Sequence, residues 1–354
     1  MNEERKDQLN RIVIKGFKSI KECDLELNNI NVLVGANGAG KSNFISAFEL
    51  YNEFSPNLNR YATKKGMNTL FYNGLKFTDE IEMEMSFQCY SVFFNIEPTE
   101  NNSLGVIDYG LKLSDCGLKL LGEVKKEDFF NKQGIFYLKP FRWYHFHDTS
   151  PSAKVKQAHN ISNCAVLFED ARNLAAFLYR LKNFFPREYS SILRAIQRAA
   201  PYFDEFALAP EEGNEELIFL RWRQKGWEDT LNPSQLSDGT LRFICLATLL
   251  LQPTKLQPAT IIIDEPELGL HPYAMTIVAE LVKKVANKKQ LILATQSAEF
   301  LDHFEAEDVI VVDRTANGSE FKRLDAEKLT AWLEDDYSLG ELWNKNLFGG
   351  RVAR

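Results

Sequence analysis

The sequence predicts an α/β fold: a mixed sheet with central parallel strands, an antiparallel β-subdomain and an inserted helical lobe. Three observations support this prediction. A glycine-rich loop at 35–42 stands between an apolar β-branched stretch and a helical pattern. An uninterrupted apolar run at 259–263 indicates a strand that is buried on both faces. Apolar residues at helical spacing within 168–200 indicate the lobe.

The glycine-rich loop fits the phosphate-binding pattern GxxxxGK[ST] at every fixed position. A predicted strand at 30–34 precedes it, and a helix to about Tyr51 follows, as the pattern requires. Glycines let backbone N–H groups curl around phosphate oxygens, and a helix N-terminus favours negative charge. Lys41 would reach the β- and γ-phosphates and Ser42 would ligate Mg²⁺. The expected nucleotide-binding residues are Asn37, Gly38, Ala39, Gly40, Lys41, Ser42 and Asn43.

Composition limits the class of protein. Of 354 residues, 45% are hydrophobic and 26% charged, which allows a large core. The net charge of −7 argues against a generic nucleic-acid coat protein but is compatible with a local basic patch. Five cysteines without a CxxC pair indicate scattered buried thiols. No signal core or bilayer-spanning apolar run occurs, so we expect a cytoplasmic protein with no membrane partner.

The first half of the chain reads mainly as strands around the loop. Two strands around a turn are expected within 11–27, before the strand at 30–34. Residues 54–75 are polar and contain Pro56, Gly66 and Gly74, so we expect them to be irregular. Strict alternation predicts a half-exposed strand over 81–87. Further strand-like stretches follow at 90–96, 105–113 and 117–124.

The second half begins with the helical lobe. Leu174, Phe177, Leu178, Leu181 and Phe185 share one face of a first helix, which Pro186 should end. A second helix is expected at 190–200, and strands at 206–208 and 217–222.

The apolar run at 259–263 ends in two carboxylates, Asp264 and Glu265. Asp264 at the strand tip can hold the Mg²⁺ shell, directly or through water. Glu265 points elsewhere and can polarise an attacking water. Alone, a solvated acidic turn would be the better interpretation. In a chain with a phosphate loop, the pair is expected to be catalytic.

Two further segments are candidate site elements. Residues 236–243, Leu-Ser-Asp-Gly-Thr-Leu-Arg-Phe, place Ser237 before an apolar helix at 243–251, which is typical of an N-cap. A predicted strand at 290–295 ends in Gln296 and Ser297. Both side chains can hydrogen-bond phosphate or water, but neither titrates as histidine does.

These four elements, with Ile14-Lys15-Gly16-Phe17-Lys18-Ser19, resemble ABC-class ATPases of the SMC, RecF and OLD type. Segment 236–240 resembles the signature motif Leu-Ser-Gly-Gly-Gln: Ser237 and Gly239 match it, whereas Asp238 and Thr240 depart from it. Gln296 stands where ABC transporters usually have histidine. The resemblance implies an ABC-type P-loop ATPase head that uses ATP and Mg²⁺.

The same resemblance implies roles for the site residues. Glu265, Lys41 and Gln296 would be catalytic, and Ser42 and Asp264 would be the metal ligands. ATP would lie between the phosphate loop of one subunit and Ser237 and Gly239 of another, in a homodimer or higher homo-oligomer. The implied organisation is an N-terminal ATPase half at 1–150, a helical insertion with connecting strands at 151–235 and a C-terminal ATPase half at 236–354.

Stretches 73–81, 144–150 and 338–343 narrow the resemblance to a family of bacterial AAA/ABC ATPases. Relatives occur in anti-phage defence systems of Septu, PARIS and retron-associated type, together with a nuclease or toxin-like effector. The leading hypothesis is therefore an ATP-driven dimerising switch for an effector protein. The alternative is a RecF- or SMC-like ATP-gated protein that binds DNA in repair, with nucleic acid as partner. Gln296 and the altered signature disfavour a transporter subunit, and a structural role would need ATP bound without turnover.

Several assignments stay open at the level of sequence. His145 and His147 alternate on a predicted strand before Asp148, where structural hydrogen bonding or a subunit contact is favoured over a metal site. His271 would touch a partner, arrange the attacking water or stabilise a turn. The remaining candidates are Gln88 or Gln157 as magnesium sensor, a basic cluster (Lys283, Lys284, Lys288 and Lys289) that is either solvated or bound to DNA, and Gly349-Gly350-Arg351 as a docking element.

Overall fold

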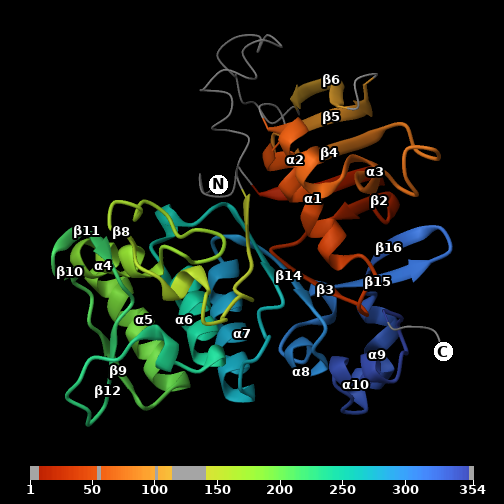
Figure 1. The fold of residues 1–354 in the computed structure, drawn as a ribbon. Coiled ribbons are helices and arrows are strands. Elements are labelled where there is room, and N and C mark those ends of the chain that lie inside the picture. Colours follow the sequence, from red (N-terminus) through yellow and green to blue (C-terminus); the bar gives the residue numbers. More distant parts are fainter. Residues whose placement is uncertain (1–7, 54–56, 100–102, 114–140, 351–354) are drawn as a thin grey trace. The chain divides into compact units, whose positions relative to one another are not determined.

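The computed structural model describes residues 8–53, 57–99, 103–113 and 141–350. The predicted strand at 117–124 lies outside these residues. The chain forms two compact units, each drawn in Figure 1. The first comprises residues 1–143, 259–264 and 288–354, and the second comprises 144–258 and 265–287. The expected boundaries near 150 and 235 stay a prediction.

The first unit contains an antiparallel five-stranded sheet in the order β2-β1-β4-β5-β6. Buried and partly exposed residues alternate along β4, as the sequence pattern predicted. The predicted hairpin within 11–27 is present as β1 and β2. The strands are β1 (Leu9–Phe17), β2 (Ile20–Glu26), β4 (Ile81–Phe87), β5 (Tyr90–Pro98) and β6 (Leu104–Leu113).

A second sheet has six strands in the order β16-β15-β3-β14-β13-β7. Its central strands β15, β3, β14 and β13 pair in parallel, so the predicted mixed sheet is confirmed. Their apolar side chains are almost fully buried, as expected for strands covered on both faces. The strands are β3 (Ile30–Val34), β7 (Phe141–Tyr144), β13 (Thr260–Asp264), β14 (Gln290–Thr295), β15 (Val309–Thr315) and β16 (Gly318–Arg323).

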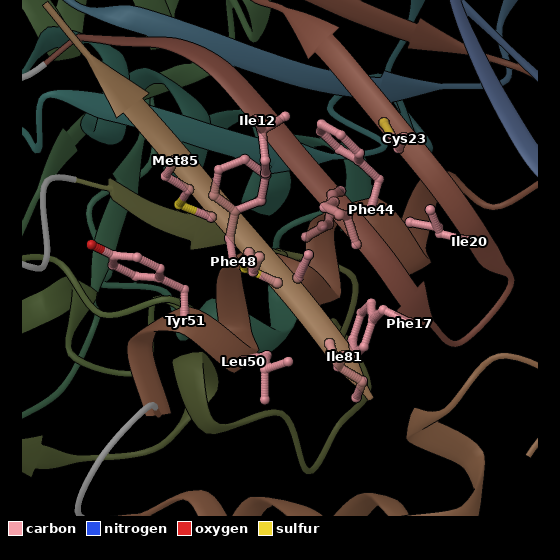
Figure 2. Close-up of a cluster of buried hydrophobic side chains, with 14 of the residues drawn as sticks. Ile12, Phe17, Ile20, Cys23, Phe44, Phe48, Leu50, Tyr51, Ile81 and Met85 are labelled. Atoms are coloured by element: carbon pink, nitrogen blue, oxygen red, sulfur yellow. The ribbon is translucent and has the colours of Figure 1, made fainter. Parts of the chain in front are cut away.

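Helix α1 (Lys41–Glu53) joins the two sheets of the first unit through one apolar cluster. Figure 2 shows Phe44, Phe48 and Tyr51 of this helix among side chains of β1 and β4. The same cluster includes Ile262 and Ile292 of the six-stranded sheet. Helix α1 begins at Lys41, within the phosphate-loop pattern. Packing of α1 in this core therefore fixes the position of the end of the loop.

The expectation that 54–75 is irregular was wrong, because two short helices lie there. They are α2 (Leu58–Lys65) and α3 (Met67–Leu70). Leu58, Tyr61 and Ala62 repeat at three- and four-residue spacing, and all three are buried. Gly66, at φ 85°, separates the helices. Burial of these few apolar residues outweighs the polar composition.

The described part of the first unit contains three further helices. They are α8 (Ala298–Leu301), α9 (Ala326–Glu334) and α10 (Leu339–Asn344). Helices α8 and α10 lie side by side, as Figure 1 shows. Gly340 makes this possible, because a Cβ there would lie 2.3 Å from the Ala298 carbonyl oxygen.

The second unit is built around four helices and two small antiparallel sheets (Figure 1). Helix α6 packs against α5 and α7. The helices are α4 (Leu174–Phe184), α5 (Pro186–Ala199), α6 (Asp238–Leu251) and α7 (Pro272–Ala286). The strands are β8 (His159–Asn160), β9 (Phe203–Phe206), β10 (Pro210–Glu211), β11 (Asn214–Ile218) and β12 (Trp222–Gln224).

Several boundaries differ from the sequence prediction. Helix α5 begins at Pro186 rather than at 190, because proline fits the first turn of a helix. Helix α6 begins at Asp238 rather than at 243, directly after its cap. The strand predicted at 206–208 is β9, which ends at Phe206. The stretch 217–222 is not one strand: Ile218 pairs with β8, and Trp222 pairs with β9.

The described cysteines fit the expectation of scattered thiols. Cys23, Cys89 and Cys245 are buried, and Cys164 is partly exposed. Burial raises the pKa of the Cys23 and Cys245 thiols to about 12. None of the helices in the described part of the chain has the length and hydropathy that a bilayer crossing requires.

The apolar cluster predicts a large effect of truncating α1. Phe48 is fully buried and packs edge-on against Phe141 at 5.0 Å between ring centroids. We expect Phe48→Ala to lower the free energy of unfolding by about 3–5 kcal/mol, because it leaves a cavity. Urea unfolding followed by circular dichroism would measure this. The matched control is Phe77→Ala, whose ring is 80% exposed, with an expected change within about 0.5 kcal/mol. Equal effects of the two changes would contradict the described core.

Candidate nucleotide-binding site

The phosphate loop connects the end of β3 to the start of α1. Gly38 and Gly40 adopt φ angles of 79° and 128°, a region that favours glycine. A Cβ at Gly40 would lie 2.2 Å from Ser319 Oγ, and one at Gly35 would lie 2.4 Å from the Val312 carbonyl oxygen. The three glycines are therefore required by backbone conformation or by close packing, whatever binds to the loop.

Lys41 folds back over the loop. Its side chain is 5% exposed, and Nζ donates hydrogen bonds to the carbonyl oxygens of Gly35 at 2.6 Å and Ala36 at 3.1 Å. The first peptides of the loop therefore hold the ammonium at the start of α1. A fixed positive charge beside a helix N-terminus suits a bound phosphate.

A polar network supports the other side of the loop. Ser319 Oγ donates to the Ala39 carbonyl oxygen at 2.6 Å and lies 2.7 Å from Ser19 Oγ. Asn43 Nδ2 donates to Ser19 Oγ at 2.7 Å. The turn after β1, the loop and the β15–β16 hairpin are thereby joined. Sequence reasoning missed Ser319, since no local pattern connects it with a loop 280 residues earlier.

Three strand ends meet at the edge of the six-stranded sheet where the loop lies. Thr295 of β14 is in register with Val34 of β3, and Ala294 is in register with Asp264 of β13. Adjacent strands lie about 4.8 Å apart, so the loop, Gln296 and Asp264 are close neighbours. The structure thus brings together the predicted site residues of the first unit.

Ser42 and Asp264 have the chemistry of Mg²⁺ ligands. The Ser42 hydroxyl is exposed at the start of α1, and the Asp264 carboxylate is partly exposed at the strand end. Hydroxyl and carboxylate oxygens are the hard donors that Mg²⁺ prefers, and it usually takes only one or two from protein. The first turn of α1 carries no acidic residue that would repel phosphate. The Ser42 hydroxyl and the Asp264 carboxylate therefore suit a bound Mg²⁺ ion beside phosphate.

Glu265 follows Asp264 but begins a stretch of the second unit. Its φ of 46° is unusual for a residue with a side chain. Such backbone strain is concentrated at functional sites, because the surrounding structure must hold it in place. Its role as general base stays a prediction.

In the second unit, Ser237 caps helix α6 as the sequence predicted. Its Oγ accepts a hydrogen bond from Thr240 N at 3.2 Å and lies 2.8 Å from Thr240 Oγ1. The Tyr202 hydroxyl contacts the same threonine oxygen at 2.9 Å. Gly239 packs against backbone, because a Cβ there would lie 2.3 Å from the Gly269 carbonyl oxygen. Although Asp238 and Thr240 depart from the signature motif, the segment still forms a capped start of α6.

Arg242 connects this helix start to two other segments. Its Nη2 donates to the His147 carbonyl oxygen at 2.9 Å and to Thr149 Oγ1 at 3.2 Å. Its Nη1 donates to the Leu268 carbonyl oxygen at 3.3 Å. Sequence reasoning did not single out this arginine. Its position five residues after Ser237 is the only local signal that could have indicated it.

Of the histidines and glutamines that the sequence left open, His145, His271 and Gln157 have ordinary structural contacts. The prediction that His145 and His147 lie on a strand was wrong, because β7 ends at Tyr144. His145 N donates a hydrogen bond to the Glu169 carbonyl oxygen. Among the described residues, no group of three His, Cys, Asp or Glu side chains could hold a metal ion. His271 caps α7, its Nδ1 accepting from Tyr273 N at 3.2 Å. Gln157 donates to the Ser152 carbonyl oxygen at 2.9 Å.

A glycine-rich loop between a parallel strand and a helix, beside a strand that ends in aspartate, defines the class of P-loop nucleotide-binding ATPase folds. Residues 30–302 match the family described as "AAA domain, putative AbiEii toxin, Type IV TA system", and the chain belongs to this family. A search of curated proteins found no match.

Solved structures show the same fold. An SMC head bound to the C-winged helix domain of ScpA has 17% identity and a TM-score of 0.59, and the match covers 90% of this chain and 99% of that one. The SMC head domain from Thermotoga maritima has 16% identity and a TM-score of 0.50, with the same coverage. An Smc head domain with an extended coiled coil, bound to the C-terminal domain of ScpA derived from Pyrococcus furiosus, has 15% identity, a TM-score of 0.60 and coverage of 93% and 99%. The predicted fold class and the resemblance to SMC-like P-loop ATPases are confirmed.

Lys18, in the turn beside the polar network, predicts a pH dependence of stability. Burial, and secondly the positive charge of Lys65, lower the pKa of Lys18 to about 8. Folding therefore favours the neutral amine, so this group destabilises the protein below pH 8. That cost is relieved as the pH rises from about 8 towards the unfolded value near 10.5.

We expect the melting temperature of the wild type to rise relative to that of Lys18→Met between pH 7.5 and 10. Thermal scans of the two proteins at each pH would measure the difference between their melting temperatures. Titration of the other groups affects both proteins equally and so cancels in this difference. A constant difference across this range would contradict the lowered pKa.

Proposed function

We propose that this chain binds ATP with Mg²⁺, hydrolyses it as a homodimer and thereby acts as a switch for an effector partner. One observation carries the proposal. The phosphate loop, Gln296 and Asp264 stand at the ends of three adjacent parallel strands, at one edge of one sheet. This is the arrangement that in-line phosphoryl transfer to water needs on one side of a triphosphate.

Each residue of this edge has a proposed role. Lys41 stabilises negative charge on the β- and γ-phosphates, and the loop N–H groups from Asn37 to Asn43 bind the phosphate oxygens. Ser42 and Asp264 hold Mg²⁺, which neutralises charge on the phosphates when bound. Gln296 orients water or the γ-phosphate through its amide. Glu265 accepts the proton of the attacking water.

The dimer is proposed from the chemistry of the triphosphate. One phosphate loop supplies donors to one side only, so a second set of donors is needed on the other. Ser237 and Gly239 stand at the start of α6, a 14-residue helix whose N-terminus favours negative charge. We place them against the γ-phosphate held by a second copy. Association would then depend on the state of the nucleotide, because only the γ-phosphate joins both copies.

The effector role draws on the family. Its description names a putative toxin and a type IV toxin–antitoxin system, which supports a function in a system with a second component. The resemblance to ATPases of anti-phage defence systems points in the same direction. An ATP-dependent dimer would present a different surface to such a partner before and after hydrolysis.

A DNA-binding repair function is the second candidate, and the fold shared with SMC heads favours it. Lys283 and Lys284 are exposed in the last turn of α7, and Lys288 and Lys289 follow in sequence. Clustered lysines suit phosphate contacts, although they also complement a helix C-terminus.

Glu265→Gln tests the proposed mechanism. The amide cannot accept a proton, so we expect turnover to fall at least ~100-fold while ATP still binds. Dimer should accumulate with ATP, as measured by sedimentation. Glu280→Gln on α7 is the control, because this exposed carboxylate pairs only loosely with Arg198 at 3.5 Å. A Glu265→Gln protein that stays monomeric with saturating ATP would refute the dimerising switch.

The DNA-binding alternative predicts a different measurement. Duplex DNA should bind the isolated chain with an affinity that falls steeply with salt. Replacing Lys283 and Lys284 by glutamate should reduce both the affinity and its salt dependence. Binding that is absent at low salt, or unchanged by the double substitution, would leave the effector switch as the better reading.

A further inference from the structure

The segment 338–350 ends on the phosphate loop. The Gly350 carbonyl oxygen accepts a hydrogen bond from Ala36 N at 2.6 Å. Gly350 N donates in turn to Asp313 Oδ1 at 2.6 Å. Asp313 belongs to β15, which pairs in parallel with β3, the strand that leads into the loop. Two hydrogen bonds thus connect a carboxylate on the neighbouring strand to the first peptide of the loop.

Two consecutive glycines permit this approach. Gly349 and Gly350 have φ angles of 90° and 81°. A Cβ at Gly349 would lie 2.6 Å from Asp313 Oδ2, and one at Gly350 would lie 3.0 Å from Trp343 Nε1. Gly350 is buried. The glycine pair that the sequence marked as a docking element therefore has a defined target.

The other end of the segment is anchored beside a second site element. Ser338 and Glu341 cap α10 with reciprocal hydrogen bonds. Gly340 N donates to Asp302 Oδ1 at 2.5 Å, directly after α8. Helix α8 itself begins two residues after Gln296. The segment therefore joins the end of β14 to the start of the phosphate loop.

The geometry of one peptide links this segment to Lys41. The Gly35 carbonyl and the Ala36 N–H belong to a single planar trans peptide, so they point in opposite directions. The N–H binds Gly350, and the carbonyl oxygen accepts from Lys41 Nζ at 2.6 Å. A hydrogen bond that fixes one side of the plane also fixes the other. Hydrogen bonds arranged in such a chain strengthen one another.

We propose that Asp313 is a positioning residue for Lys41, acting through Gly350 and the Gly35–Ala36 peptide. This inference rests on the proposed function, because Lys41 is taken to hold the phosphates. Asp313 touches no phosphate itself. It holds the 338–350 segment against the loop, and the segment orients the carbonyl that receives the Lys41 ammonium. The proposed nucleotide site thus includes Asp313 and Gly350, which lie outside the phosphate-loop pattern.

Calorimetric titration of the full chain with Mg–ATP tests the proposal. We expect Asp313→Ala to weaken binding about tenfold, the effect of one lost hydrogen bond to a charged group. Asp313→Asn keeps an oxygen acceptor for Gly350 N and should bind nearly as the wild type does. The matched control is Glu320→Ala, an exposed carboxylate on the same hairpin, which should leave the affinity unchanged.

A double-substitution cycle separates positioning from general stability. In a Lys41→Met background, Asp313→Ala should weaken ATP binding no further, because its effect passes through the lysine. Equal weakening in both backgrounds, or none in the wild type, overturns the proposal while ATP binding itself stands. A wild-type chain that binds no ATP overturns the proposed function and this inference together.

Hydrogen exchange gives a readout that needs no nucleotide. Ending the chain at Phe348 removes Gly350, and we expect the amide of Ala36 to lose its protection in the ATP-free protein. Ending the chain at Arg351 keeps the Gly350 peptide, and protection should persist. Equal exchange in the two truncated chains would show that Gly350 does not hold the loop.

Discussion

Parallel pairing of β3, β14 and β13 is the constraint on which the candidate site depends. Parallel strands present their carboxyl ends at one edge, so three segments far apart in sequence reach the same place. In the observed register, Ala294 of β14 stands opposite Asp264 of β13, and Thr295 of β14 stands opposite Val34 of β3. A shift of one residue in β13 would turn Asp264 to the other face of the sheet. The proposed chemistry therefore depends on the parallel pairing of these buried strands as much as on the polar residues at their ends.

The parts of this site that were predictable from sequence are those whose geometry is local. The phosphate loop needs a strand, three glycines and a helix in succession, and all of these are consecutive. Ser237 at the start of α6 and the buried strand ending at Asp264 were likewise recognisable from neighbouring residues. The fold class followed from the same signals, because a parallel strand beside a phosphate loop admits few architectures.

The parts that were not predictable depend on tertiary packing. Ser319, Asp313 and Arg242 each contact a segment that is distant in sequence. Nothing in the neighbourhood of Ser319 or Asp313 distinguishes them from surface polar residues, and the only local signal for Arg242 is its position five residues after Ser237. Helix α2 was missed for a related reason: its polar composition suggested a loop, and only burial of Leu58 and Tyr61 stabilises it. The single strand predicted over 217–222 failed because its two ends pair with different partners.

The setting of Gln296 has a consequence for how this position can respond to its surroundings. Thr295 Oγ1 accepts from Ser297 N at 3.0 Å, and Ser297 Oγ accepts from Phe300 N at 3.1 Å. The backbone is thus tied to the strand on one side and to a capped helix on the other. The backbone of residue 296 therefore has little freedom to move. When a molecule binds nearby, Gln296 must respond by rotation about its own side-chain bonds.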